Sequence, residues 1–152
     1  MTVREARPDE AAAITDLAMR AKAHWGYDRD FMEACRAELT WAPEEVEQHD
    51  VLVWEQHGRL LGATARLGAE PDARLWAVFV DPVAHGRGIG RALLTALLSR
   101  ARDAGCRSLS IGADPNAEGF YRAVGAARVG TVPSDTVEGR VLPLMRFDLA
   151  SA

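Results

Sequence analysis

The chain has 152 residues, of which 48% are hydrophobic and 26% are charged, and its formal net charge is −4. This length fits one domain, residues 1–152, with a core of its own, and the acidic balance gives no general basic field for nucleic acid. No apolar stretch approaches the ~20 residues of a membrane-spanning helix, so the sequence predicts no membrane partner.

The first third of the chain predicts a strand and two helices. Thr2–Ala6 fits a short strand, and Pro8 with the two acidic residues after it opens a helix that has one apolar face. Residues 24–28 interrupt that helix, and apolar residues with helical spacing predict a second helix over 31–39. Pro43 and the acidic residues that follow it predict a connecting turn.

Three β-rich runs come next, at Asp50–Glu55, Arg59–Leu67 and Arg74–Val80. The bend at 56–58 contains a glycine, so the first two runs predict a hairpin, and the third run completes an antiparallel meander. The last part of the third run, Trp76–Val80, is wholly apolar and ends just before an Asp-Pro pair. We therefore expect a buried central strand there.

Glycines at positions 86, 88 and 90 separate this strand from a helix predicted over Arg91–Ala104. Glycines let the backbone approach a ligand closely, and the first turn of a helix has unpaired amides at the positive end of its dipole. The loop therefore suits a phosphate or pyrophosphate, with Arg87 and Arg91 adding positive charge. A simple tight turn explains the spacing equally well. The dinucleotide fingerprint and the P-loop have different patterns.

The rest of the chain predicts one helix and three strands. A strand fits Arg107–Gly112, and a helix fits Asn116–Ala123, with Asp114 as its cap and a glycine at its end. Closing strands fit Ala127–Val132 and Leu144–Leu149.

Two cysteines, Cys35 and Cys106, are too few for a disulfide scaffold, and no Cys/His cluster has zinc spacing. We expect free thiols, no metal and a cytoplasmic location. Lys22 is the single lysine beside seventeen arginines, which we attribute to the base composition of the genome.

The glycine loop resembles motif A of the GNAT acetyltransferase superfamily, Gln/Arg-x-x-Gly-x-Gly/Ala at the start of a helix after a central strand. Gly88 and Gly90 match, whereas His85 stands where Gln or Arg is usual. Residues 113–126 resemble motif B, an Asn followed by a helix with an aromatic-Tyr pair and a final glycine. The predicted element order, β-α-α-β-β-β-α-β-α-β-β, is also that of the family. The resemblance implies an α/β, GNAT-like acyl-CoA N-acyltransferase fold, whose mixed, mostly antiparallel sheet has a central, splayed parallel strand pair and flanking helices.

The resemblance also implies a site for acetyl-CoA as cosubstrate. The pyrophosphate would bind main-chain amides of the glycine loop, and the pantetheine arm would lie against the central strand, with a strand N–H near the acetyl oxygen. The implied contacts are Val78, Phe79, Val80, His85, Gly86, Arg87, Gly88, Ile89, Gly90, Arg91 and Asn116.

Tyr121 is the expected catalytic residue. A phenol with a pKa of about 10 stays protonated at neutral pH and donates a proton to a departing thiolate, the role of the matching tyrosine in the family. The alternative is a tyrosine half in the core that serves only for packing.

We therefore expect an N-acetyltransferase that moves an acetyl group from acetyl-CoA to a primary amine of a small molecule or peptide by direct attack. One alternative is an acyl-CoA-binding sensor module without turnover. Another is an α/β nucleotide-binding domain, which the glycine spacing disfavours. Homodimerisation is expected only because it is usual in the family.

The acceptor pocket is expected between the first helix pair and the last strand pair, with His24, Trp25 and Tyr27 on one side and residues 134–140 on the other. Plain packing explains these aromatic residues as well. Four candidates for the general base remain open and are Glu70, Asp81, His24 and His85.

Overall fold

The computed structural model describes residues 3–68 and 71–150. In chain order the strands are β1 (Val3–Glu5), β2 (Asp50–Gln56), β3 (Arg59–Leu67), β4 (Asp72–Val80), β5 (Ser108–Gly112), β6 (Ala127–Pro133) and β7 (Val141–Asp148). The α-helices are α1 (Ala11–Ala23), α2 (Arg29–Leu39), α3 (Pro43–Gln48), α4 (Ile89–Asp103) and α5 (Glu118–Val124). Short 3₁₀ helices are η1 (Pro8–Glu10), η2 (Pro82–Ala84) and η3 (Pro115–Ala117). Among the described residues, no helix has the length and apolar character needed to cross a membrane.

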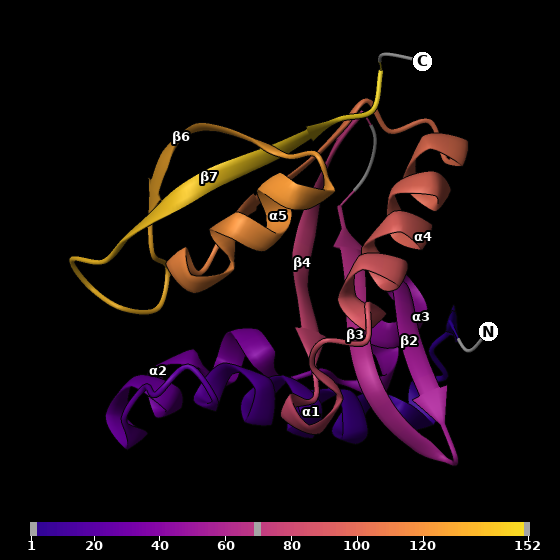
Figure 1. The fold of residues 1–152 in the computed structure, drawn as a ribbon, viewed down its shortest axis with the longest axis vertical. Helices are drawn as coiled ribbons and strands as arrows, with labels where there is room; N and C mark the ends of the chain where they lie inside the picture. Colours follow the sequence, from indigo (N-terminus) through magenta and orange to yellow (C-terminus); the bar gives the residue numbers. More distant parts are fainter. Residues whose placement is uncertain (1–2, 69–70, 151–152) are drawn as a thin grey trace.

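The strands form one seven-stranded sheet in the order β1-β2-β3-β4-β5-β7-β6 (Figure 1). Strands β4 and β5, which flank α4 in the chain, pair parallel, and the other neighbours pair antiparallel. The predicted α/β class, the mostly antiparallel sheet and its parallel pair next to the glycine helix are therefore confirmed.

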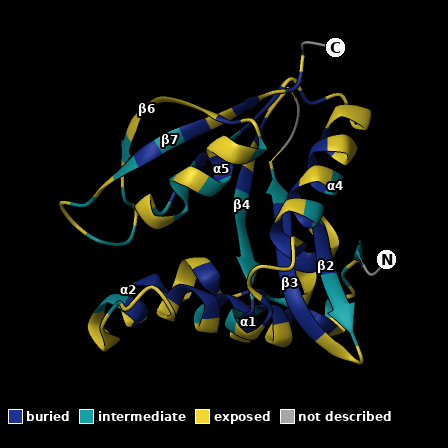
Figure 2. Cartoon of the chain, viewed as in Figure 1, coloured by how far each residue is buried: buried dark blue, intermediate teal, exposed yellow. Residues whose placement is uncertain are grey.

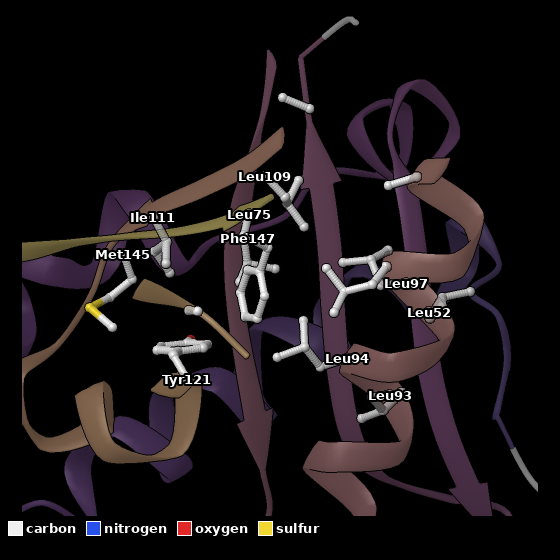
Figure 3. Packing of buried hydrophobic residues seen from close by; sticks show 14 of the residues in the cluster. Leu52, Leu75, Leu93, Leu94, Leu97, Leu109, Ile111, Tyr121, Met145 and Phe147 are labelled. Atoms are coloured by element: carbon white, nitrogen blue, oxygen red, sulfur yellow. The ribbon is translucent and has the colours of Figure 1, made fainter. Parts of the chain in front are cut away.

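Helix α4 covers one face of β2, β3 and β4. Leu93 and Leu97 are fully buried there and share a cluster with Leu52 and Leu75 of the sheet (Figure 3). Gly62 in β3 permits this close packing, because a Cβ at that position would lie 2.7 Å from Cδ1 of Leu93. The packing of α4 on the sheet therefore determines the position of the glycine loop, which connects β4 to α4.

Helix α1 packs on the opposite face of the sheet, where Ile14 and Leu17 meet Val53 and Ala63. Strand β3 is buried along most of its length between the two layers (Figure 2). Helix α2 extends α1 past the edge of this contact and packs through Met32 and other apolar residues near β4 (Figure 1). Both helices therefore lie close to the second half of β4.

Three sequence predictions need correction. The segment after Pro43 is the short helix α3, not a turn, and the carboxylate of Glu45 accepts the amide of Ala42 (2.9 Å) at its start. Strand β7 begins at Val141, three residues earlier than predicted. The run Trp76–Val80 is half-buried and not fully buried. The reason for this last difference is that β4 pairs with β3 there but has no strand on its other side, where β5 pairs only with residues 72–74.

Candidate active site

The sheet opens between its two parallel strands. Pairing of β4 with β5 covers only Asp72–Arg74 and Ser108–Ser110, while β5 continues to pair with β7 as far as Gly112. In Figure 1, β7 lies near β4 only at its C-terminal end and is well separated from it at its other end. A cavity of about 550 Å³ lies at this opening, lined by β4, the start of α4, α5, the end of α1, α2 and the β6–β7 loop. The predicted splayed strand pair is confirmed.

A β-bulge turns one backbone amide of β4 into the opening. The register of β3 and β4 shifts between Thr64 and Arg66, which leaves an extra residue in β4. Thr64, fully buried, donates its hydroxyl to the carbonyl of Ala77 at 2.8 Å. The amide of Val78 donates across the opening to Oη of Tyr121 at 3.2 Å. A local backbone irregularity thus supplies a main-chain donor at the cavity.

Tyr121 comes from α5 and is only 2% exposed. It packs in the same cluster as Met145 and Phe147 of β7 (Figure 3). Burial raises the pKa of Tyr121 well above its usual range; the Val78 amide acts against this and the charge of Asp114 adds to it. The hydroxyl oxygen accepts the Val78 amide, so its hydrogen remains available for a second partner. The residue is therefore a protonated donor throughout the physiological pH range.

The loop before α4 (residues 85–88) has two glycines in left-handed backbone conformation, Gly86 (φ 82°) and Gly88 (φ 78°). A Cβ at either position would meet no atom within 4 Å, so conformation and not packing requires glycine. Gly88 is the N-cap of α4 and provides no side chain to cap its first amides. Arg91 lies exposed beside them. Uncapped amides, a helix dipole and an arginine fit a pyrophosphate.

Side chains from distant segments meet at another part of the cavity. Asp114 accepts Nζ of Lys22 at 3.3 Å and Oη of Tyr27 at 2.8 Å. The same Tyr27 oxygen accepts Nδ2 of Asn116 at 3.0 Å and Nη2 of Arg140 at 2.8 Å. We call these five residues the Asp114 cluster. It joins the end of α1, the segment before α2, η3 and the β6–β7 loop.

Asp114 is ionised in this cluster. Its burial acts to raise the pKa of the carboxyl, but hydrogen bonds from the Asn116 amide and Tyr27 and the charge of Lys22 together lower it. Burial, with Asp114 nearby, raises the pKa of the Tyr27 hydroxyl. The Tyr27 ring stacks on Phe31 (4.0 Å between centroids) and so holds the cluster against α2.

Asp81, a candidate base, has a structural role, because both of its carboxylate oxygens accept hydrogen bonds from other segments of the chain. It is 2% exposed, and its Oδ2 accepts Arg20 (3.0 Å) and Arg59 (3.1 Å) while Oδ1 accepts the amide of Val83 (3.1 Å). Burial acts to raise the pKa of Asp81, and these three donors outweigh it and lower the pKa. Asp81 is not among the residues that line the cavity. Its bonds instead tie the end of β4 to α1 and β3.

The remaining base candidates are placed as follows. The rings of His24 and His85 meet edge-on, with 5.2 Å between centroids, and a ring nitrogen of His85 lies 3.3 Å from the carbonyl of Val80. His85 lines the cavity and His24 does not. Glu70 lies outside the described residues. A role for either histidine as the base stays a prediction.

Comparison with known proteins decides the family. The sequence model of the Acetyltransferase (GNAT) family matches residues 12–126, which include the glycine loop and Tyr121. The chain belongs to the GNAT acetyltransferase family. The resemblance seen in the glycine loop and in the Tyr121 helix is therefore confirmed.

Individual GNAT relatives agree with this assignment. An aminoglycoside N(6′)-acetyltransferase type 1 of Stenotrophomonas maltophilia is 35% identical over 136 residues, covering 82% of this chain and 84% of that protein. The N-alpha-acetyltransferase RimI of Mycobacterium tuberculosis is 42% identical over 78 residues, covering 48% of this chain and 49% of that protein. The acetyltransferase YncA of Salmonella typhimurium, solved with acetyl-CoA, superposes with a TM-score of 0.69 at 25% identity, over 98% of this chain and 94% of that one. The GNAT fold thus extends over nearly the whole chain.

The structure brings most of the predicted GNAT site together at one cavity. Tyr121 lines it, as do all the implied acetyl-CoA contacts except Arg87, which is exposed outside it. Of the predicted acceptor residues, Trp25 lines the cavity, whereas His24 and Tyr27 do not. Tyr27 instead supports Asp114, which does line it. The predicted acetyl-CoA contacts that line the cavity are Val78, Phe79, Val80, His85, Gly86, Gly88, Ile89, Gly90, Arg91 and Asn116.

Sequence reasoning missed three residues of this GNAT site. Lys22, which we attributed to genome composition, is buried against Asp114. A single lysine in an arginine-rich chain was the available signal. Glu38 at the end of α2 also lines the cavity, and no pattern in the sequence marks it. Thr64 supports the bulge through its hydroxyl. In the sequence it cannot be distinguished from any other threonine of a strand.

Proposed function

We propose that this GNAT protein transfers an acetyl group from acetyl-CoA to a primary amine of a small molecule or peptide, by direct attack of the amine. The observation that carries the proposal is the meeting of the Val78 amide with the Tyr121 hydroxyl, 3.2 Å apart, where β4 and β5 separate. A main-chain donor and a protonated phenol at the same place suit the two charges that develop when a thioester is cleaved.

Binding of acetyl-CoA is assigned to the start of α4 and to β4. The uncapped amides after Gly88 and the side chain of Arg91 would hold the pyrophosphate. The half-buried apolar residues Val78 and Val80 would contact the pantetheine arm. The arm would lie along the edge of β4 that has no strand beside it. The relative YncA, solved with acetyl-CoA, supports acetyl-CoA as the cosubstrate.

The chain supplies two groups to the chemistry. The Val78 amide would donate to the carbonyl oxygen as negative charge develops on it, and such fixed donors cost no reorganisation during the reaction. The Tyr121 hydroxyl would give its proton to the thiolate of coenzyme A as the C–S bond breaks. Because Asp81 is already bonded to two arginines, we assign the amine's proton to another acceptor, either water or His85, which lines the cavity.

The test is a mass balance between thiol and product. The full chain is incubated with acetyl-CoA and a panel of alkylamines, arylalkylamines, an aminoglycoside and a peptide with a free N-terminus, the last two chosen because relatives act on such groups. Free thiol and acetylated amine are then quantified together. The proposal expects at least one amine to give equal amounts of both. Tight acetyl-CoA binding without product from any amine would instead support the sensor alternative.

A further inference from the structure

Glu38 and two tryptophans line the cavity, and Glu38 and Trp76 are in direct contact. Trp25 follows α1, Glu38 lies in the last turn of α2, and Trp76 belongs to β4, and all three line the cavity. Nε1 of Trp76 donates to the main-chain carbonyl of Glu38 at 2.9 Å, which fixes the indole against the end of α2. Trp25 is 48% exposed and Glu38 is also exposed. A ligand that enters the cavity can therefore reach both.

The charges around the cavity single out Glu38. Its lining includes two carboxylates among the described residues, Asp114 and Glu38. Asp114 is engaged by Lys22 and Tyr27. Within the described part of the chain, the Glu38 carboxylate forms no ion pair, because no Lys, Arg or His nitrogen lies within 4.0 Å of it. Glu38 is thus the lining carboxylate that remains available to a cationic ligand.

The aromatic ring in contact with Glu38 is held by its neighbours. The Trp76 ring meets Trp41 edge-on (centroids 5.1 Å apart, 88° between planes) and also contacts Phe79 (5.1 Å, 69°). Fixed aromatic rings beside a carboxylate bind ammonium groups through cation–π attraction and a charge-assisted hydrogen bond. An alkylamine with a pKa of about 10 reaches the protein almost wholly as ammonium at neutral pH.

We propose that Glu38 and Trp76 form the ammonium-binding subsite for the acceptor, and that the acceptor is a cationic alkyl- or arylalkylamine whose apolar body contacts the rest of the cavity lining, including Trp25. This inference rests on the proposed acetyl transfer and names its substrate class. Glu38 acts in specificity: it draws the ammonium to the Trp76 side of the cavity, away from the cations Lys22 and Arg140. The proposed chemistry belongs to the Val78 amide, two residues further along β4 than Trp76, and to the Tyr121 hydroxyl of α5 that meets it.

The test compares two probes that differ in charge and share a skeleton, phenethylamine and 2-phenylethanol. Their affinities for the full chain loaded with coenzyme A are measured by ligand-observed NMR titration. Wild type should bind the amine more tightly than the alcohol. Glu38→Gln should weaken amine binding roughly 2- to 5-fold and leave binding of the alcohol unchanged, because only a charge is removed from an exposed side chain. Added salt should weaken amine binding in wild type and not in the variant.

The matched control is Glu33→Gln on the same helix, whose carboxylate pairs with Arg36 (3.0 Å) and does not line the cavity. It should change neither affinity. Glu38→Asp, which keeps the charge, should recover much of the amine preference. Equal binding of both probes to wild type, or an equal loss of both in Glu38→Gln, would overturn the proposal. Each titration is repeated without coenzyme A and beside the thiol assay, so a failure of acetyl transfer with intact amine preference would count against the proposed function alone.

Discussion

The two ends of the cavity are built in different ways. At the donor end, which we define as β4 from Val78 to Val80 and the loop and helix start at 85–91, the chain is nearly continuous in sequence. The donors there are backbone amides of a bulge and of a helix N-terminus. The polar side chains assigned a role there are Tyr121 and, at the pyrophosphate, Arg91. This end depends on the course of the backbone.

The proposed acceptor end consists of the Asp114 cluster and the lining residues Trp25, Glu38 and Trp76. Its bonds join residues far apart in sequence, 92 positions for Lys22 and Asp114 and 113 positions for Arg140 and Tyr27. Side chains make almost every contact. We therefore expect that a GNAT chain can change its acceptor by exchanging side chains on α1, α2 and the β6–β7 loop without disturbing the donor end.

The largest expected effect falls on the donor end. Gly88→Glu places a carboxylate where an anion is expected to bind, so measurable coenzyme A binding should disappear in calorimetry while circular dichroism shows a folded chain. Gly58→Glu is the matched control, because Gly58 has the same left-handed backbone (φ 76° against 78°) and equally open surroundings but lies in the β2–β3 hairpin. Unchanged affinity in folded Gly88→Glu would remove the pyrophosphate from this loop.

The second effect tests the point where the two ends meet. Tyr121→Phe removes only the hydroxyl and keeps the buried ring, so acetyl-CoA should bind nearly as in wild type. Turnover should fall in kcat by about 10²–10⁴-fold, because the proton is needed only as the thiolate leaves. Single-turnover rates are required if product release limits wild type. Equal single-turnover rates would leave Tyr121 as a packing residue.

The third effect breaks the acceptor end. Asp114→Asn keeps a good helix cap and removes the charge that Lys22 and Arg140 share, which should cost about 2–4 kcal/mol of unfolding free energy, measured by urea denaturation. Since the folded pKa of Asp114 is lowered, its stabilisation is present at neutral pH and is lost as the pH falls through that value. The variant and wild type should therefore converge in acid. A constant difference at all pH values would contradict the ionic account, and the exposed control Asp103→Asn should show no difference.

The smallest effect belongs to His85, which replaces the Gln or Arg usual in the motif. If backbone amides do most of the binding, His85→Ala should weaken coenzyme A binding by no more than about 0.5–1.5 kcal/mol, the value of one ordinary hydrogen bond. Calorimetry measures it directly. A loss of several kcal/mol would show that the donor end depends on side chains after all and would weaken the contrast between the two ends.

The donor end could be predicted from sequence because its signals are local. An apolar strand, spaced glycines and a helix follow one another within thirty residues, and Tyr121 lies in a second short motif. The bulge could not be predicted, because it exists only in the pairing of Thr64 with Val78 on another strand. Helix α3 could not be predicted for a different reason, because six residues are too few to show helical periodicity.

The acceptor end could not be assembled from sequence. Trp25 and Arg140 are predicted lining residues. The sequence around them does not indicate that Arg140 bonds to Tyr27 or that Lys22 bonds to Asp114. Tyr27 is predicted to line the cavity, but it instead donates a hydrogen bond to Asp114, which does line it. Such contacts depend on how the separate layers of the fold come together, and a single sequence carries no pattern for them.

The central claim is that the thioester binds where β4 leaves β5, between a main-chain amide and a buried phenol. A crystal structure of the full chain with acetyl-CoA tests it most directly. We expect the pyrophosphate on the amides at the start of α4, the acetyl oxygen within hydrogen-bonding distance of a β4 amide, and the thioester sulfur within reach of the Tyr121 hydroxyl. An acetyl group outside this opening, or a Tyr121 hydroxyl still bonded to Val78 and remote from the sulfur, would contradict the account.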